Sequence, residues 1–429
     1  MSSRSSNYGA LAKGLKVGIV GGSITACAAA ILLRRAGADV SLYERSSGNL
    51  QDRGVGLAMK ISTLEELARR DVIDDDIGTV PVWTRTFARP HANPAQQDTP
   101  WQVFWEQPVA FYANHWGVLF RSLRKRVPDS SYHHGYEVVG AEQRTDGTVE
   151  LRFDNHKPRA FDLVLFADGY ESLGRRLLHP DVAIGAARYF LWRGMIDEAV
   201  LPIPDGHDQT ITFFGYKYGH GFVYYVPSPE QGGDSARRVN WAFHETVAGK
   251  TIPGIEPDGD GYVRTGLRPG AASTEQIAYC REMAREYFPP YFGDVVEATP
   301  QPFIQPVMDA LAPHYTRGRM ALVGDAATLS RPHIGGGAGK ALDDVLALVD
   351  MLAVGQSVDG VLAGWDRLRS AFGAEVHDLG RSLGKHLVEQ TPDWTVMDQA
   401  SMDQWWEEVQ AGRYWFWVNE VKDKHPEWQ

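Results

Sequence analysis

The first part of the chain carries the pattern of a βαβ unit that binds a dinucleotide. Residues 15–20 are mostly apolar and predict a short buried strand, and residues 39–43 predict a second strand that ends at Glu44. Glu44 follows Gly21 by 23 positions (44 − 21), close to the roughly 20 at which an acid meets the ribose hydroxyls of a bound dinucleotide. The chain is therefore expected to fold around a Rossmann-like α/β domain.

The turn after the first predicted strand is built mostly of small residues. It consists of Gly21, Gly22, Ser23, Ile24, Thr25 and Ala26. Ser23 and Ala26 stand where this fingerprint usually has glycine, but Ser23 is small enough to let a pyrophosphate approach, and alanine is a permitted third residue. The helix that follows begins with unpaired backbone N–H groups, which favour an anion. A carboxylate at position 44 disfavours a 2′-phosphate.

A second segment with the features of an anion site lies late in the chain. Residues 319–323 predict a buried strand, and Gly324 and Asp325 follow it directly. After a turn that contains Pro332, residues 335–337 are three glycines that open an apolar helix. The helix start favours negative charge. By itself, the segment could also be a βα turn with flexible glycines.

A third segment, in mid-chain, combines a predicted strand with an acidic turn. Residues 161–166 are mostly apolar, and Asp168-Gly169 and Arg175 follow them. Taken alone, this is compatible with an ordinary strand-to-helix turn in which Asp168 caps the helix.

The three segments, in this order and spacing, resemble the flavoprotein aromatic hydroxylases. These are single-component (class A) FAD monooxygenases typified by p-hydroxybenzoate hydroxylase, and the dihydroxypyridine hydroxylases are the most similar branch. Val20–Ser23, Tyr43–Ser46, Trp192-Arg193-Gly194, Gly324–Ala327 and Arg331-Pro332-His333 carry the resemblance, which covers roughly residues 15–390.

The resemblance implies both an architecture and a reaction. The expected fold is α/β, with a Rossmann-like FAD-binding domain, a mixed-sheet substrate domain and C-terminal helices. The expected enzyme uses NADPH or NADH and O₂ to hydroxylate a hydroxylated aromatic or N-heteroaromatic small molecule through a flavin C4a-hydroperoxide. Only one dinucleotide fingerprint is present, so we expect the nicotinamide to dock transiently.

The resemblance also assigns cofactor contacts beyond the first turn. These residues are Glu44, Arg45, Gly54, Val55, Gly56, Leu57, Trp116, Asp168, Gly324, Asp325, Pro332, Gly335, Gly336 and Gly337. Trp116 stands where relatives often have an arginine that contacts the flavin, Thr328 where many have histidine, and Phe166 where many have a small residue. Asp325 is expected to bind the ribityl chain, and Pro332 to pack near the flavin where oxygen reacts.

The remaining sequence suggests how the domains are divided. We expect a discontinuous FAD-binding domain over residues 15–80, 109–185 and 306–390. A substrate-binding sheet is expected over residues 81–108 and 186–305, because apolar and polar positions alternate there with a period of two. Residues 391–429 are rich in tryptophan, and either pack onto the body or a second subunit, or form a lid over the substrate entrance.

Hydroxylation of a phenol-like ring is helped by a base that removes the hydroxyl proton. Candidates for catalysis are Tyr225, His220, His244, His333 and Arg193. Each has an ordinary structural alternative, because a sheet tyrosine or histidine is usually a hydrogen bonder and Arg193 could be an ion-pair partner.

Composition limits the partners and the compartment. A net charge of −11 argues against nucleic acid or an anionic membrane as the partner. No apolar run reaches the ~18 residues of a membrane span, and two cysteines indicate no disulfide framework. We expect a cytoplasmic protein that binds a small aromatic substrate, and the sequence is compatible with a homodimer. No metal is expected, because zinc-type ligand spacing is absent and His133-His134 is expected to lie in a surface loop.

Two other functions remain compatible with the same motifs. One is an FAD-dependent oxidase or dehydrogenase of this fold that inserts no oxygen. The other is a non-catalytic flavin-carrying protein whose tryptophan-rich tail binds a partner.

Overall fold

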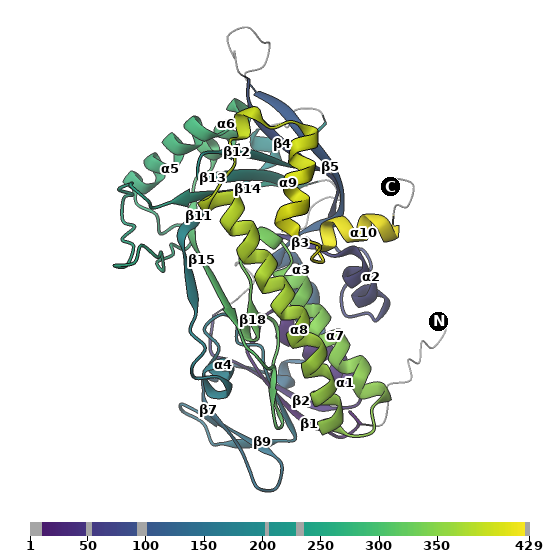
Figure 1. Ribbon diagram of the computed structural model, residues 1–429. Helices are drawn as coiled ribbons and strands as arrows, with labels where there is room; N and C mark the ends of the chain where they lie inside the picture. Colours follow the sequence, from purple (N-terminus) through teal and green to yellow (C-terminus); the bar gives the residue numbers. More distant parts are fainter. Residues whose placement is uncertain (1–10, 49–53, 92–100, 202–205, 229–235, 425–429) are drawn as a thin grey trace.

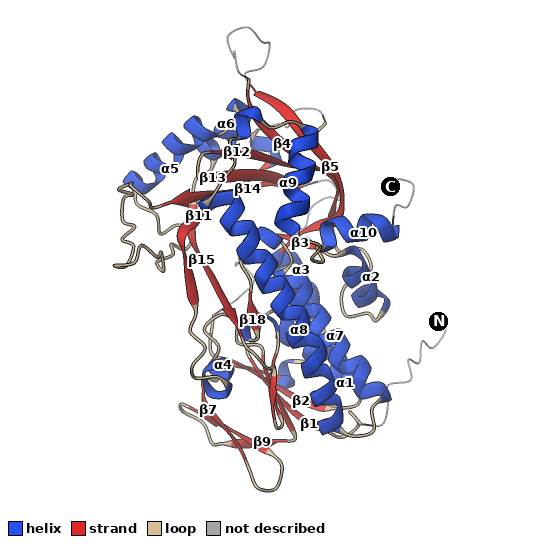
Figure 2. Ribbon diagram, in the orientation of Figure 1, coloured by secondary structure: helices blue, strands red, loops and turns tan. Residues whose placement is uncertain are grey.

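The computed structural model describes residues 11–48, 54–91, 101–201, 206–228 and 236–424. It has two lobes, and a long helix runs between them (Figure 1). The lower lobe is built on a six-stranded sheet and the upper lobe on a nine-stranded one. Figure 2 shows how the strands are concentrated at the two ends, with helices along one side.

The six-stranded sheet contains the predicted dinucleotide unit. Its order is β16-β17-β10-β1-β2-β6, and all neighbours are parallel except β16 and β17. The strands are β1 (Lys16–Val20), β2 (Asp39–Glu44), β6 (Tyr132–His134), β10 (Leu163–Phe166), β16 (Thr316–Arg317) and β17 (Met320–Leu322). The inner strands are apolar and buried on both faces, as parallel strands usually are.

Helices cover this sheet on one side and a small antiparallel sheet lies near its lower end. Helix α1 (Ile24–Arg35) packs between α3 (Trp116–Arg124) and α7 (Gly337–Val354), and α7 packs on α8 (Val358–Gly384). The small sheet consists of β7 (Val138–Gln143), β8 (Val149–Phe153) and β9 (Arg159–Phe161). The predicted loop at His133-His134 was wrong: both residues belong to β6, and the His133 ring stacks on Tyr43 at 5.0 Å.

The nine-stranded sheet has the order β18-β15-β11-β14-β13-β12-β4-β5-β3. Its strands are β3 (Gly56–Met59), β4 (Val80–Pro90), β5 (Trp101–His115), β11 (Gly185–Asp197), β12 (Thr210–Tyr216), β13 (Gly219–Pro227), β14 (Arg237–Thr246), β15 (Phe303–Leu311) and β18 (Thr328–Leu329). We place β3 in the proposed substrate domain although it lies within residues 15–80, because β3 pairs with β5. Likewise, β5 continues past residue 108.

The remaining helices complete the two lobes. Helices α5 (Thr274–Tyr287) and α6 (Pro290–Ala298) pack on the outer face of the large sheet, where Phe288 contacts Phe214. The others are α2 (Ile61–Arg69), α4 (Leu173–Leu178), α9 (Gln399–Gln410) and α10 (Phe416–Lys424). Among the described helices, none has the length and apolar character needed to cross a membrane.

The tryptophan-rich segment packs onto the body of its own chain. Trp406 stacks on Trp105 of β5 at 6.0 Å, and Trp417 stacks on Phe111 of the same strand at 4.6 Å. Arg85 of β4 lies over the Trp406 ring at 4.0 Å, within an aromatic enclosure. These contacts agree with the packing alternative, although Trp428 lies outside the described residues.

One tail contact caps a helix in the other lobe. Helix α2 has no side-chain cap of its own, and the buried Glu420 carboxylate of α10 accepts hydrogen bonds from the backbone N–H groups of Ile61 (2.7 Å) and Ser62 (3.2 Å). Anions at a helix N-terminus are stabilising. Glu420→Ala is therefore expected to lower the free energy of unfolding by about 1–3 kcal/mol. Urea denaturation tests this, with the exposed Glu408→Ala as control; equal midpoints for the two variants would contradict it.

Candidate functional site

The turn between β1 and α1 requires glycine at position 21, and it leaves the N-terminus of α1 without a side-chain cap. Gly21 has φ +106°, and a Cβ atom there would overlap the carbonyl oxygen of Ala167. Ser23 precedes α1, but its side chain accepts no hydrogen bond from the first turn. The first N–H groups of α1 are therefore not capped by that side chain, and an anion could bind them.

Glu44 lies beside this turn, at the end of β2. Its carboxylate is buried and accepts a hydrogen bond from the backbone N–H of Ser46 at 2.8 Å. A Cβ atom at Gly22 would lie 2.8 Å from Glu44 Oε2, so the predicted acid and the glycine turn are adjacent. Arg45, the next residue, forms an exposed ion pair with Glu171 of the turn between β10 and α4 at 3.6 Å.

The turn after β10 has an acid with one unused oxygen. Asp168 Oδ2 accepts from the backbone N–H of Leu173 at 2.7 Å, whereas Oδ1 is buried and has no partner. Burial raises the pKa of this carboxyl. Ser172, and not Asp168, is the N-cap residue of α4, with its hydroxyl accepting from the Arg175 N–H at 3.0 Å.

Arg175 joins the second and third motifs. Its guanidinium donates to the carbonyl oxygens of Asp325 (3.0 Å) and Ala326 (3.1 Å). The Asp325 side chain is exposed, yet burial by the surrounding protein raises its pKa. Asp325 lies in the short helical turn after β17, at the carboxyl ends of the parallel strands.

A buried ionic network holds this loop from behind. Asp344 of α7 accepts a hydrogen bond from the Gly324 N–H at 3.1 Å. The same carboxylate pairs with Lys340 and with Arg369 of α8, each at 2.7 Å. Burial lowers the pKa of Lys340, but the charge of Asp344 and the contact with Tyr315 outweigh it, so the net shift is upward. The loop is thus fixed to two helices.

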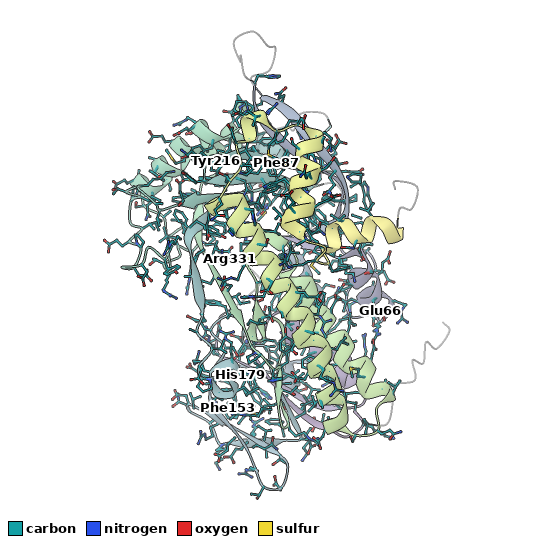
Figure 3. All side chains as sticks on the ribbon, in the orientation of Figure 1. Glu66, Phe87, Phe153, His179, Tyr216 and Arg331 are labelled. Carbon is teal, nitrogen blue, oxygen red and sulfur yellow. The ribbon has the colours of Figure 1, made fainter. Side chains whose placement is uncertain are left out.

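The glycines after Pro332 make a second tight turn before α7. Gly335 has φ +62°, Gly336 is the N-cap residue and Gly337 is the first residue of the helix. The segment is anchored on both sides: Arg331 pairs with Asp309 at 2.7 Å, and the Trp415 indole N–H donates to the Ile334 carbonyl at 2.9 Å. Figure 3 places Arg331 between the two lobes.

The loop at residues 54–57 is bound to the large sheet. The Gly56 N–H donates to Asn240 Oδ1 at 3.1 Å, and Leu57 belongs to β3. The Val55 carbonyl accepts from the Trp116 N–H at 3.1 Å. The Trp116 ring stacks on Phe120 at 5.0 Å, within its own helix.

The inner face of the large sheet brings histidines to the Arg331–Gly337 loop. His220 of β13 and His244 of β14 are fully buried with ring centroids 4.3 Å apart, and His333 stacks on His244 at 4.3 Å. Burial lowers the pKa of all three; that of His220 falls to about 3. These imidazoles are therefore neutral at physiological pH.

Two other predicted catalytic residues lie differently. Arg193 is on the inner face, where its guanidinium donates to the Gln305 amide oxygen at 2.8 Å and burial lowers its pKa. Its partner is thus an amide and not a carboxylate. Tyr225 is on the outer face, beneath the Arg237 guanidinium at 4.8 Å, and is not brought to the histidines. Tyr224, its neighbour in sequence, lies on the inner face near Gly56.

The sequence prediction missed several groups of this inner face. They are Tyr189, Tyr224, Asn240 and Gln305. The period of two along β13 could have found Tyr224, since positions 220, 222 and 224 share one face of a strand and position 225 has the other.

Comparison with known proteins identifies the fold. A family model described as FAD binding domain-like matches residues 186–309, which span β11 to β15. The chain is 26% identical to 2,6-dihydroxypyridine 3-monooxygenase of Paenarthrobacter nicotinovorans over 360 residues, 82% of this chain and 86% of that protein. The solved structure of 2,6-dihydroxypyridine-3-hydroxylase from Arthrobacter nicotinovorans matches with a TM-score of 0.75 at 23% identity, over 90% of this chain and 97% of that one. The chain is thus similar, in sequence and in fold, to flavin-dependent aromatic hydroxylases.

A second solved structure shows the same fold with its cofactor. Klebsiella pneumoniae HpxO complexed with FAD and uric acid matches with a TM-score of 0.69 at 18% identity, over 95% of this chain and 96% of that one. The predicted resemblance and the α/β fold class are confirmed, and the FAD-binding family model and the monooxygenase relatives agree with the prediction of an FAD-dependent oxidoreductase.

Proposed function

We propose that this chain is an NAD(P)H-dependent FAD monooxygenase that hydroxylates a hydroxylated aromatic or N-heteroaromatic small molecule. One observation carries the proposal. Three turns that lie far apart in sequence, at Gly21, Asp168 and Gly324, follow adjacent parallel strands of one sheet. Ligands of open α/β sheets bind at this carboxyl edge. The relative that acts on 2,6-dihydroxypyridine and the neighbour that holds uric acid support a polar heteroaromatic substrate.

The residues present fit FAD. The free start of α1 would bind the pyrophosphate, and Glu44 would accept hydrogen bonds from the ribose. Asp325 would accept a hydrogen bond from a ribityl hydroxyl. The start of α7, at Gly336 and Gly337, would stabilise negative charge on the pyrimidine end of the flavin. Bound FAD supplies the hydride chemistry with NAD(P)H and the activation of O₂.

The inner sheet face fits the substrate. Phe213, Phe222 and Tyr224 share it with His220 and His244, so it is largely aromatic and buried. Such a wall excludes water from the reacting centre. Because His220 and His244 are neutral, each can accept a hydrogen bond from a substrate hydroxyl, which polarises the O–H bond and enriches the ring in electrons.

The test is a substrate screen with two readouts. Dihydroxypyridines, phenols and fused heteroaromatics are added to the FAD-loaded protein with NADH or NADPH. We expect at least one to accelerate nicotinamide oxidation and to gain the mass of one oxygen atom. Accelerated oxidation without an oxygenated product would support an oxidase or dehydrogenase instead. A yellow protein with no substrate-dependent turnover across the panel would support a non-catalytic flavin carrier.

The cofactor assignment predicts the effect of one substitution. Asp325→Ala removes a carboxylate that would bind the ribityl chain, and a hydrogen bond to a charged group contributes about 1.5–3 kcal/mol. The dissociation constant of FAD is therefore expected to rise by roughly 10- to 150-fold. Titration of the apoprotein by flavin fluorescence measures it, with the exposed Asp181→Ala as control. A variant that retains FAD as well as the control does would remove Asp325 from the cofactor site.

A further inference from the structure

The hydrogen-bond partners of the three buried histidines determine which ring nitrogen of each histidine carries the proton. His333 Nε2 lies 2.8 Å from the Tyr189 hydroxyl, and that hydroxyl also receives a hydrogen bond from the Arg331 guanidinium at 3.1 Å. A guanidinium only donates, so the tyrosine oxygen accepts from Arg331 and its own proton is free for His333. We assign the hydroxyl proton to the bond with His333 Nε2, where it has an acceptor, and this assignment places the single proton of the neutral ring on Nδ1.

The same reasoning gives the same tautomer for the two sheet histidines, but it leaves their Nε2 atoms, and not Nδ1, facing away from the backbone partner. His244 Nδ1 lies 3.4 Å from the His220 carbonyl, and His220 Nδ1 lies 3.4 Å from the Leu387 carbonyl. A carbonyl oxygen only accepts, so Nδ1 carries the proton in both rings. Their Nε2 atoms are therefore acceptors. The set of His333, His244 and His220, here called the histidine array, offers one donor and two acceptors.

Two of these atoms are buried and have no partner. His333 Nδ1, a donor, and His244 Nε2, an acceptor, make no hydrogen bond within the described structure. Buried polar groups are nearly always paired, and an exception requires an explanation. The ring centroids lie 4.3 Å apart with an angle of 20° between the planes, so the donor and the acceptor belong to two adjacent, stacked rings.

The array also has the composition of a metal site, but its geometry differs. Its nitrogen atoms lie within 4.8 Å of one another. An imidazole binds a metal through a lone pair in the plane of the ring, so each ring plane must contain the ion. Nearly parallel stacked planes share no such point between His244 and His333. In addition, Tyr189 occupies His333 Nε2. The array is thus suited to hydrogen bonding rather than to coordination.

We infer that the histidine array recognises a ring edge that carries a hydrogen-bond acceptor next to a donor, as in the C=O and N–H of a pyridone-type lactam. His333 Nδ1–H binds the carbonyl oxygen and His244 Nε2 binds the N–H. Tyr189 and Arg331 are positioning residues, because they direct the His333 proton toward the ligand. The inference rests on the proposed function, since it names the substrate class of the same site.

The test measures binding to the FAD-loaded protein without NAD(P)H, by perturbation of flavin absorbance. The probes are 2-pyridone and 2-pyranone, which have similar shapes but differ in an N–H and a ring oxygen. We expect the wild-type protein to bind 2-pyridone at least about 10-fold more tightly, because 2-pyranone leaves His244 Nε2 unpaired. Equal affinities for the two probes would overturn the inference.

Two variants separate the two halves of the array. His244→Leu is expected to bring the ratio of the two affinities close to 1. Tyr189→Phe lets the His333 proton move to Nε2, so both affinities fall by roughly 10-fold while their ratio is kept. A merely structural role would not produce these two different patterns. His179→Leu, in the lower lobe away from Arg331, is the control and leaves both affinities unchanged (Figure 3).

The outcomes also distinguish this inference from the proposed function. Hydroxylation of phenols with no preference for 2-pyridone would refute the array and leave the monooxygenase intact. The predicted affinity ratio without any oxygenated product would support the array and refute the monooxygenase. Stoichiometric Zn²⁺ binding that His244→Leu abolishes would overturn the hydrogen-bonding assignment in favour of a metal site. If the His244→Leu variant does not load FAD, the conservative Tyr189→Phe variant still tests the inference, because both affinities must fall while their ratio is kept.

Discussion

Asp344→Ala is expected to lower the free energy of unfolding by about 3–5 kcal/mol, a large part of the stability of an ordinary protein. The carboxylate is fully buried and neutralises two cations, Lys340 and Arg369, each at 2.7 Å. Its removal leaves both cations buried without their partner. It also leaves the Gly324 N–H without its acceptor. The loss should therefore greatly exceed that of an ordinary ion pair.

Asp350 is the matched control because it lies on the same helix, α7. It pairs with Arg70 at 2.6 Å, but its side chain is 55% exposed. An exposed pair contributes at most about 1 kcal/mol, so Asp350→Ala should have a small effect. Urea denaturation with and without FAD measures both variants. Equal losses would show that the buried network does not hold the Gly324 loop.

Local patterns in the sequence were sufficient for the central strands of the lower lobe, but not for its edge strand β6. Each strand next to β1 is a short apolar run followed by a glycine or acid turn, and these features are contained within about 10 residues. Parallel strands buried on both faces are apolar throughout, so they are easy to locate in a sequence. The Gly21-Gly22 turn and Glu44 were predicted from the same βαβ spacing, and the structure places Gly22 beside the Glu44 carboxylate.

The substrate face could be predicted only in part. The histidine array combines positions 220, 244 and 333, which no local spacing in the sequence connects. The pairing of β13 with β14 brings the first two together, and the path of the Arg331–Gly337 loop adds the third. Tyr225 was chosen by residue type, whereas the alternation of the strand gives the inner face to Tyr224. The capping of α2 by Glu420 depends on where the tail docks, which is a tertiary property.

Gly21→Ala is expected to abolish most FAD binding. The position has φ +106°, which costs an alanine about 1–2 kcal/mol, and the added Cβ would overlap the backbone oxygen of Ala167. Backbone cannot rotate away as a side chain does, so β1 and β10 must separate at their carboxyl ends, at a further cost of about 1–3 kcal/mol. That movement displaces the Asp168 turn as well. Two of the three proposed cofactor turns are thus disturbed by one methyl group.

The expected result is a rise of at least about 100-fold in the dissociation constant of FAD, because the strain is relieved by opening the turn that would bind the pyrophosphate. Gly147→Ala is the matched control: it has a similar φ of +87° but no atom within 4 Å of the added Cβ. It should lose stability without losing FAD. Flavin fluorescence gives the affinity of each variant, and urea denaturation gives its stability. If both variants bind FAD equally well, the β1–α1 turn does not hold the pyrophosphate, and Glu44 loses its place beside the ribose.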